Sequence, residues 1–126
     1  MRKKSPLDIY ADENSVSTID IPKIRHAFDG INIKLMKCGS LEEAQNMINM
    51  AKSFKMKTML GCMVETSIGI TAASHLAANV DCVDLDGNLL IKNDPYKGAT
   101  VLNGKLVLPE QNGLGVKLTS KEDGLL

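Results

Sequence analysis

The sequence predicts an α/β fold in which parallel strands alternate with helices in four βα units. Three observations lead to this fold class. Short apolar runs alternate with helical patterns over the first 92 residues, each strand places aliphatic side chains on one face, and polar side chains gather where the strands end. Strands connected by helices of this length form right-handed βαβ units around a parallel sheet.

The first half of the chain contains two predicted strands joined by a helix. The strands are "LDIYAD" and "INIKLM", at residues 7–12 and 31–36. Between them, Asp20 and Pro22 favour the start of a helix that ends near Phe28. Proline is tolerated there because the backbone N–H groups of the first helical turn have no hydrogen-bond partner within the helix.

A longer helix, "LEEAQNMINMAKSFK", is predicted over residues 41–55. Ser40 precedes it as the expected N-cap, and Glu43, three residues on, completes a capping box. Its apolar residues recur at helical spacing: Leu41, Ala44, Met47, Ile48, Ala51 and Phe54. A stripe of this kind with a polar back predicts a helix that packs on the sheet by one face.

The second half begins with the predicted strand "KTMLGCMV" at residues 57–64 and continues to the strand "CVDLDG" at residues 82–87. The helix between them, residues 67–80, is apolar on nearly every side, which predicts deep packing. The stretch "ATVLNGKLVLP" predicts a short β-hairpin, because Asn103 and Gly104 favour a type I′ turn between two apolar runs.

Alternation of side chains separates the two faces of each strand. Asn32 and Lys34 lie opposite the aliphatic residues of the second strand, and Asp84 and Asp86 do so in the fourth. Polar groups on one face at the carboxyl ends of strands favour a (β/α) barrel, because catalytic groups cluster there. A flavodoxin-like open sheet is the alternative, although both of its faces are buried in apolar side chains.

Charge and composition exclude several classes of partner. Fifteen basic and fifteen acidic residues cancel, so we expect neither a nucleic acid nor an anionic membrane as partner. No apolar run is long enough to span a membrane, and the amino terminus lacks the apolar segment of a signal peptide. Cys38, Cys62 and Cys82 form no CxxC pair, which favours small buried side chains over a disulfide or zinc site and predicts a cytoplasmic protein.

Residue type alone leaves a structural alternative for each candidate site residue. Lys34 fits a surface lysine as well as a base at a strand end, and Lys37 fits a solvated loop charge. Asp84 and Asp86 fit either a binding pair or the flanks of a turn. Glu65 fits either a carboxylate that leads a helix or a partner of Lys34.

Five stretches together resemble one family: "IYADEN", "INIKLMKCGS", "MLGCMVETSIGITAASHLA", "VDLDGNLL" and "NGLGV". They are similar to the carboxyl-terminal half of the barrel in the enolase superfamily. Within it they resemble the dipeptide epimerases of the muconate-lactonizing subgroup, typified by L-Ala-D/L-Glu epimerase. The resemblance covers about residues 6 to 118, and its five motifs follow in order at strand-helix spacing.

This resemblance implies the carboxyl-terminal half of a (β/α)8 barrel followed by a hairpin. The implied organisation is a partial barrel domain over residues 1–118. It consists of a half-barrel, 6–92, and a hairpin with a return segment, 93–118. Residues 119–126 are expected to form a flexible tail, and the family's amino-terminal capping domain is expected to be absent.

The resemblance also implies a role for each candidate residue. Asp12 matches the third carboxylate ligand of an essential Mg²⁺, and Lys34 matches the acid/base lysine on the sixth barrel strand. Asp84 and Asp86 match the pair that binds the ammonium group of a dipeptide substrate.

The end of the third strand matches a segment that lines the substrate pocket, which implies contacts from Cys62, Met63 and Val64. Glu65 follows as a candidate partner that would support the lysine without touching the substrate. Enzymes of this kind remove the proton beside a carboxylate through an enediolate and return it on the other face. A divalent metal stabilises the charge that develops, and a lysine base must lose its own proton for part of the cycle.

Other parts of such an enzyme have no counterpart in this sequence. They are an opposing lysine in a K-x-K pattern, the first two metal carboxylates and the capping domain. We therefore expect a fragment that is inactive alone, with its partner either the missing amino-terminal half or a second copy joined through open sheet edges. The alternatives are an o-succinylbenzoate synthase-like or cycloisomerase-like enzyme of the same subgroup, or a non-catalytic half-barrel that self-associates.

Overall fold

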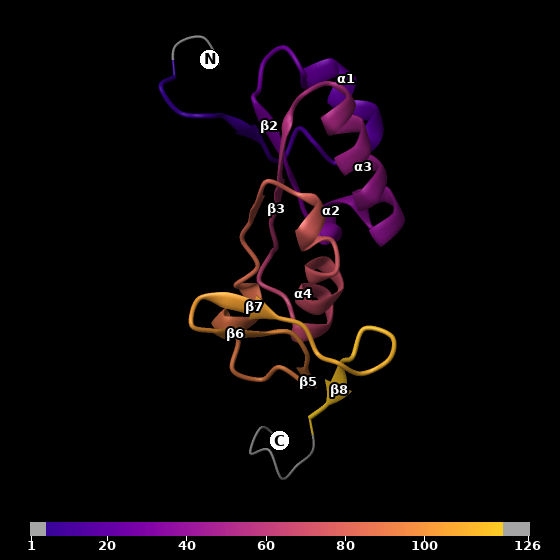
Figure 1. Cartoon of the computed structure of the whole chain (residues 1–126), viewed down its shortest axis with the longest axis vertical. Coiled ribbons are helices and arrows are strands. Elements are labelled where there is room, and N and C mark those ends of the chain that lie inside the picture. Colours follow the sequence, from indigo (N-terminus) through magenta and orange to yellow (C-terminus); the bar gives the residue numbers. More distant parts are fainter. Residues whose placement is uncertain (1–4, 120–126) are drawn as a thin grey trace.

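Four parallel strands form the central sheet of the computed structural model, which describes residues 5–119 (Figure 1). They are β1 (Tyr10–Ala11), β2 (Gly30–Ile33), β3 (Lys57–Leu60) and β4 (Cys82–Val83), and their order in the sheet is their order in the chain. Each neighbouring pair is parallel. A sheet that adds one parallel strand per unit without reversing direction is a segment of a barrel, so the predicted fold class is confirmed and the open flavodoxin-like sheet is wrong.

Helices α1 (Ile21–Ile24), α3 (Leu41–Ser53) and α4 (Ser67–Ser74) lie along one side of this sheet (Figure 1). The other helical segments are η2 (Thr18–Asp20), α2 (Leu35–Cys38), η3 (Ala77–Asn79) and η4 (Gly87–Leu90). Two of the predicted helices are shorter than expected. The first ends at Ile24 rather than near Phe28, and the apolar segment 67–80 divides into α4 and η3.

Local chemistry explains where α3 begins and which face it buries. The Ser40 hydroxyl oxygen accepts a hydrogen bond from the Glu43 N–H at 3.0 Å, as predicted for an N-cap. The Glu43 carboxylate does not complete the predicted capping box, because it accepts from the Thr18 N–H at 2.7 Å and so joins α3 to η2. The buried residues of α3, which belong to the core, are Ala44, Met47, Ile48 and Ala51.

The register of the sheet gives each face its own row of side chains. The row beneath the helices comprises Ala11, Ile31 and Thr58, none more than 1% exposed. The row on the other face comprises Asn32, Met59 and Cys82, and its exposure increases toward the edge strand β4. The backbone of Lys34 is still extended just beyond β2, so its side chain lies on the same face of the sheet as that of Asn32.

The second strand is three residues shorter at its carboxyl end than the sequence predicts. Its pairing with β3 ends at Ile33, and residues 35–38 form the helix α2 instead of strand. The Lys34 carbonyl accepts hydrogen bonds from Lys37 and Cys38, and Gly39 closes the turn at φ +84°. A left-handed residue of this kind ends a helix at little cost when it is glycine.

The carboxyl-terminal segment contains the predicted hairpin and an additional pairing. Strands β6 (Thr100–Leu102) and β7 (Lys105–Val107) pair around Asn103 and Gly104, whose φ angles of +51° and +74° confirm the predicted turn. Strands β5 (Tyr96–Lys97) and β8 (Lys117–Leu118) pair as well, which the sequence analysis missed. Thr119, the first residue of the predicted tail, is buried and bonded to Pro95; residues 120–126 lie outside the described part.

Two features bear on the expected environment of the chain. Among the helices of residues 5–119, none is long and apolar enough to cross a membrane. All three cysteines are free; Cys38 and Cys62 are half-buried and Cys82 is exposed. The prediction of small buried cysteines is therefore wrong for Cys82, because it belongs to the edge strand β4 and lies on the sheet face that the described helices do not cover.

Candidate active site

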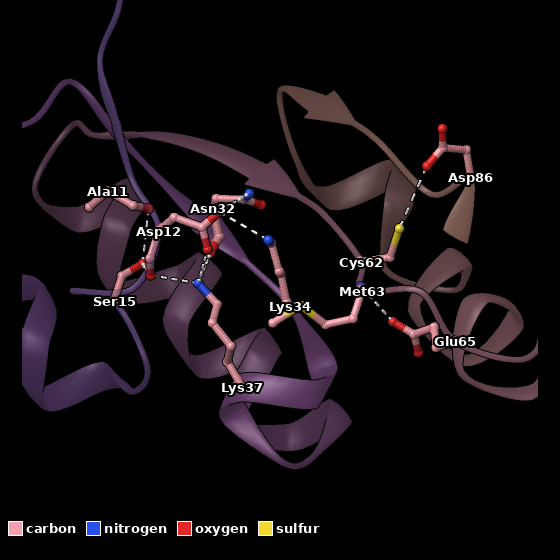
Figure 2. Close-up of polar contacts among 10 residues, drawn as sticks. All are labelled: Ala11, Asp12, Ser15, Asn32, Lys34, Lys37, Cys62, Met63, Glu65 and Asp86. Atoms are coloured by element: carbon pink, nitrogen blue, oxygen red, sulfur yellow. Dashed lines mark hydrogen bonds and ion pairs between the residues drawn. The ribbon is translucent and has the colours of Figure 1, made fainter. Parts of the chain in front are cut away.

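The candidate residues meet at the carboxyl ends of the four parallel strands. Asp12 follows β1, Lys34 follows β2, Cys62 and Met63 follow β3, and Asp86 follows β4 (Figure 2). Parallel strands bring their carboxyl ends to one edge of a sheet, which is why residues far apart in sequence gather here. The sequence predicted this gathering, and the structure shows it.

An ion pair joins the first two strands at this edge. Lys34 Nζ lies 3.0 Å from Asp12 Oδ2, and the two side chains are 16% and 29% exposed. The same carboxylate oxygen accepts a hydrogen bond from Asn32 Nδ2 at 3.0 Å. The amine of residue 34 is thus directed inward, toward the carboxylate predicted to bind a metal, and the structural alternative of a surface lysine is wrong.

Lys37 is the unexpected member of the cluster. Its ammonium group donates to Asp12 Oδ1 at 2.5 Å, to the Asp12 carbonyl at 2.5 Å and to the Asn32 carbonyl at 2.9 Å. Its side chain is only 10% exposed. The expectation of a solvated loop charge is wrong because residues 35–38 are helical, and the helix α2 directs Lys37 back over the end of β1 (Figure 2).

The two lysines set the ionisation of Asp12. Burial opposes the charged carboxylate, but the hydrogen bonds and charges of Lys37 and Lys34 outweigh it, so the pKa of Asp12 falls below its ordinary value. Asp12 therefore remains a carboxylate at neutral pH, which is the form that binds a divalent cation.

Asp84 and Asp86 occupy the far edge of the sheet. Both are exposed, and neither has an ion-pair partner within residues 5–119. They line a cavity of about 340 Å³ beside the edge strand, whose opposite wall includes Val101 and Leu106 of the hairpin. Two uncompensated carboxylates beside apolar side chains are suited to an ammonium group that carries an apolar substituent.

The end of β3 separates the two pairs of charges. Cys62 is half-buried, and its Sγ lies 4.0 Å from Asp86 Oδ1. Burial raises the pKa of the Cys62 thiol, and the charge of Asp86 adds to this effect, so the thiol stays protonated. Met63 and Val64 follow it as exposed apolar side chains, 42% and 64% accessible, at the position predicted for pocket-lining residues.

Glu65 is held by the backbone next to it. Its Oε1 accepts a hydrogen bond from the Met63 N–H at 3.0 Å (Figure 2). Its Oε2 is buried without a hydrogen-bond partner among the described residues, in space left by Gly69. The ion pair of Lys34 goes to Asp12, so the geometry gives no support to Glu65 as a partner of that lysine.

A magnesium site here would be incomplete within the described chain. Asp12 offers the carboxylate oxygen that a hard cation prefers. No group of three or more His, Cys, Asp or Glu side chains suited to a metal occurs within residues 5–119. The donor is right in kind but too few in number, so residues 5–119 do not form a magnesium site by themselves.

Sequence reasoning missed three contributors to the site. Asn32 and Lys37 both bind Asp12, and the β6–β7 hairpin forms a wall of the cavity. Asn32 shares its strand face with Lys34, which was a usable signal. The helical turn that redirects Lys37 left no comparable signal, because "LMKC" has no cap residue before it.

Comparison with protein families and curated proteins agrees with this geometry. Residues 1–122 match the model of the family described as "Enolase C-terminal domain-like". The chain is 49% identical over 114 residues to the L-Ala-D/L-Glu epimerase of Bacteroides thetaiotaomicron, an alignment that covers 90% of this chain and 30% of that protein.

Solved structures extend the comparison to three dimensions. The dipeptide epimerase of Enterococcus faecalis, complexed with Mg and the dipeptide L-Leu-L-Tyr, superposes with a TM-score of 0.82 at 38% identity. The match covers 90% of this chain and 34% of the epimerase chain. The N-succinyl Arg/Lys racemase of Bacillus cereus gives a TM-score of 0.87 at 31% identity, covering 98% and 34%. The chain thus spans about a third of the length of the proteins that it matches.

Proposed function

This chain belongs to the enolase C-terminal domain-like family, and from that premise we propose that it supplies the carboxyl-terminal half of the active site of a Mg²⁺-dependent dipeptide epimerase. The observation that carries the proposal is the inward-facing ion pair between Lys34 and Asp12 at the strand ends. Asp84 and Asp86, which have no ion-pair partner within residues 5–119, also lie at the carboxyl ends of the strands.

Lys34 is proposed as the residue that takes and returns the proton on one face of the substrate's α-carbon. A lysine base must exchange its proton within the cycle, and a partly enclosed amine beside a metal-binding carboxylate is suited to this. Its partner Asp12 would hold Mg²⁺ when the ion is bound, and the ion supplies positive charge where the substrate carboxylate accumulates negative charge.

Asp84 and Asp86 are proposed to bind the ammonium group of the dipeptide. They lie two strands from Lys34, about 10 Å away in a sheet of ordinary spacing. That separation matches a substrate whose ammonium group and reacting carbon belong to different residues. Cys62, Met63 and Val64 lie between the two ends and are proposed to contact the middle of the dipeptide.

The chain is proposed to be inactive by itself. It spans about a third of the length of its relatives, and the described residues offer one carboxylate to a metal that needs several ligands. The opposing base and the remaining metal ligands are proposed to come from an amino-terminal half. The free thiols Cys38, Cys62 and Cys82 support a reducing cytoplasm as its compartment.

A second candidate substrate class follows from one comparison. The N-succinyl Arg/Lys racemase is as similar in structure as the dipeptide epimerases, and a succinylated amino group carries no positive charge. The positive charge of such a substrate is on its arginine or lysine side chain, which the exposed Asp84 and Asp86 could also bind. The dipeptide is favoured because the chain is 49% identical to an L-Ala-D/L-Glu epimerase and 31% identical to the racemase.

Exchange of the substrate α-proton with deuterated solvent tests the proposal. The assay uses a dipeptide and Mg²⁺ with this chain alone, and then with the amino-terminal half of a related dipeptide epimerase added. We expect exchange and epimerisation only in the mixture. Replacing Lys34 by Met should abolish epimerisation and the exchange of the one epimer whose α-proton faces Lys34. The proposal fails if the mixture is inactive, or if the Lys34→Met variant still epimerises the dipeptide at the rate of the unaltered chain.

A further inference from the structure

Two lysines bind the same carboxylate, yet their surroundings differ. An ammonium group has three N–H donors. Lys37 directs them at three oxygens, namely the carbonyl and Oδ1 of Asp12 and the carbonyl of Asn32. Lys34 has a single ion-pair contact, to the other carboxylate oxygen of Asp12. Lys37 thus has more of its N–H donors bonded than Lys34, and its side chain is also the more buried of the two.

The contacts of Lys37 connect three separate segments. Its own residue lies in α2, Asp12 follows β1, and Asn32 belongs to β2. Two of its three acceptors are main-chain carbonyls, whose positions the strands determine. The third is the Asp12 carboxylate, so Lys37 holds this side chain against the backbone of both strands.

The backbone of Asp12 has a second support. Ser15, which is fully buried, donates from its backbone N–H to the Asp12 carbonyl at 3.0 Å and from its hydroxyl to the Ala11 carbonyl at 3.0 Å. These bonds close the turn after β1 but do not reach the carboxylate. The carboxylate orientation therefore depends on its side-chain partners, Lys37 on Oδ1 and Lys34 with Asn32 on Oδ2.

We propose that Lys37 is a positioning residue that fixes the orientation of the Asp12 carboxylate, the group that would bind the metal. The proposal rests on the function proposed above, in which Asp12 is a metal ligand and Lys34 a base. Groups that orient a metal ligand in this way contribute about 10- to 100-fold to metal affinity. Lys37 acts through Asp12 and does not touch the substrate.

The first test is made on the unaltered chain by NMR of the lysine side-chain ammonium groups. We expect a resolved, slowly exchanging signal from Lys37, because its three protons are engaged and shielded from water. The exposed Lys52 of α3 is the reference and should exchange fast. The proposal is overturned if the Lys37 ammonium exchanges with water as rapidly as that of Lys52, and this result does not depend on any variant folding.

The second test measures the side-chain rotamer of Asp12 through three-bond couplings to its carboxylate carbon. Variants Lys37→Met, Lys34→Met and Lys52→Met each remove one charge and keep the apolar stem. We expect a single Asp12 rotamer in the unaltered chain, in Lys34→Met and in Lys52→Met, and averaged couplings only in Lys37→Met. Slow amide exchange in β2 and β3 verifies the fold. A fixed Asp12 in a folded Lys37→Met variant rejects the proposal.

The third test separates this inference from the proposed function. With the amino-terminal half added, Lys37→Met should raise the half-saturating Mg²⁺ concentration about tenfold or more. Lys34→Met should abolish epimerisation at every Mg²⁺ concentration. If the unaltered mixture shows no exchange, the proposed function fails, while the NMR results still decide whether Lys37 fixes Asp12. An active mixture whose Mg²⁺ requirement is unchanged by Lys37→Met contradicts the positioning role.

Discussion

At the scale of single residues, the charges at the sheet edge fall into two groups with different compensation. Asp12 receives two ammonium groups and an amide, whereas Asp84 and Asp86 have no ion-pair partner within the described chain. The free-energy cost of an unpaired charge increases as the group is removed from water. Asp84 and Asp86 are exposed, so they can remain charged and unpaired when no cation is bound. This contrast is the reason why we propose the metal at Asp12 and a substrate cation at Asp84 and Asp86.

Replacing Asp84 or Asp86 by Asn should discriminate between substrates. In the mixture with the amino-terminal half, we expect each change to lower kcat/KM for a dipeptide by about 10- to 100-fold, since a hydrogen bond to a charged group contributes about 1.5–3 kcal/mol. The matched control is the same dipeptide acetylated at its amino group, for which the loss should be small. Equal losses with the two substrates would show that these carboxylates do not bind the ammonium group.

At the scale of elements, short contacts between strands and helices determine where the site residues lie. Ser40 determines the first turn of α3, and Asp81 joins the segment before β4 to the start of β3. Gly87 lets the chain after β4 approach the end of β3, because a Cβ on this residue would lie 2.0 Å from the Met63 carbonyl oxygen. Each of these contacts can be tested by a separate substitution.

Ser40→Ala should lower the free energy of unfolding by about 1 kcal/mol, because the Glu43 N–H loses the acceptor that caps α3. Ser53→Ala is the control at the other end of the same helix, where the hydroxyl is exposed, and it should change the value by less than about 0.5 kcal/mol. Urea unfolding followed by circular dichroism measures both. Similar values for the two variants would contradict the assignment of Ser40 as the N-cap.

Asp81 should make the stability of the fold depend on pH. The Thr58 N–H and hydroxyl donate to its carboxylate at 2.7 and 2.9 Å, and these bonds hold the pKa of Asp81 below its ordinary value. A group whose pKa falls on folding stabilises the fold fully above the unfolded pKa of about 3.9, and this stabilisation disappears as the pH falls through the lower, folded value.

Asp81→Asn keeps an acceptor for Thr58 but cannot titrate. We therefore expect the urea midpoint of the unaltered chain to fall more steeply between about pH 5 and pH 2 than that of Asp81→Asn. Glu110→Gln, which changes an exposed carboxylate near the end of the chain, is the control and should keep the steeper dependence. Parallel curves for all three proteins would be evidence against this linkage.

Gly87→Ala should disturb the site more than the fold. The added methyl group meets the Met63 carbonyl, so the ends of β3 and β4 must separate, and with them Cys62 and Asp86. We expect weaker dipeptide binding in the mixture, seen as a higher KM. Gly113→Ala is the control, because its Cβ meets nothing within 4 Å, it does not line the cavity beside Asp84 and Asp86, and the cost comes only from φ +68°. A KM that is raised more by the control variant would refute this account.

At the scale of the whole molecule, the four-stranded sheet within residues 5–119 has two edge strands and one face without helices from that part of the chain. Strands β1 and β4 each have a single neighbour, and the face that carries Asn32 and Cys82 lies opposite the helices. A barrel removes both edges by closing on itself. A second half that pairs with β1 and β4 would enclose Asp12 and Lys34 and bring further ligands to them.

Mg²⁺ binding should therefore depend on that second half. We expect the isolated chain to remain unsaturated at about 1 mM Mg²⁺, because one carboxylate already shared by two lysines competes poorly with the water around the ion. Calorimetric titration of the chain, alone and mixed with the amino-terminal half, measures the difference. Tight binding by the isolated chain that survives Asp12→Asn would place the metal elsewhere.

Much of this architecture could be predicted from local patterns. The four strands, the cap of α3 and the turn at Asn103 and Gly104 follow from periodicity and from single residues with strong preferences. The meeting of Asp12 with Lys34 was also predictable, since parallel strands bring their carboxyl ends together. Strand length was less predictable, because a strand ends where its neighbour stops pairing, as β2 does at Ile33.

What local patterns left open is how each charge is used. Both Lys34 and Lys37 belong to one short stretch, and only the helical turn of α2 decides that the second reaches back to Asp12 and is buried there. Likewise, nothing near the hairpin in sequence indicates that it lies across a cavity from Asp84 and Asp86. Residue preferences act over a few positions, whereas the partners of a charge come from segments that only packing brings within hydrogen-bond distance.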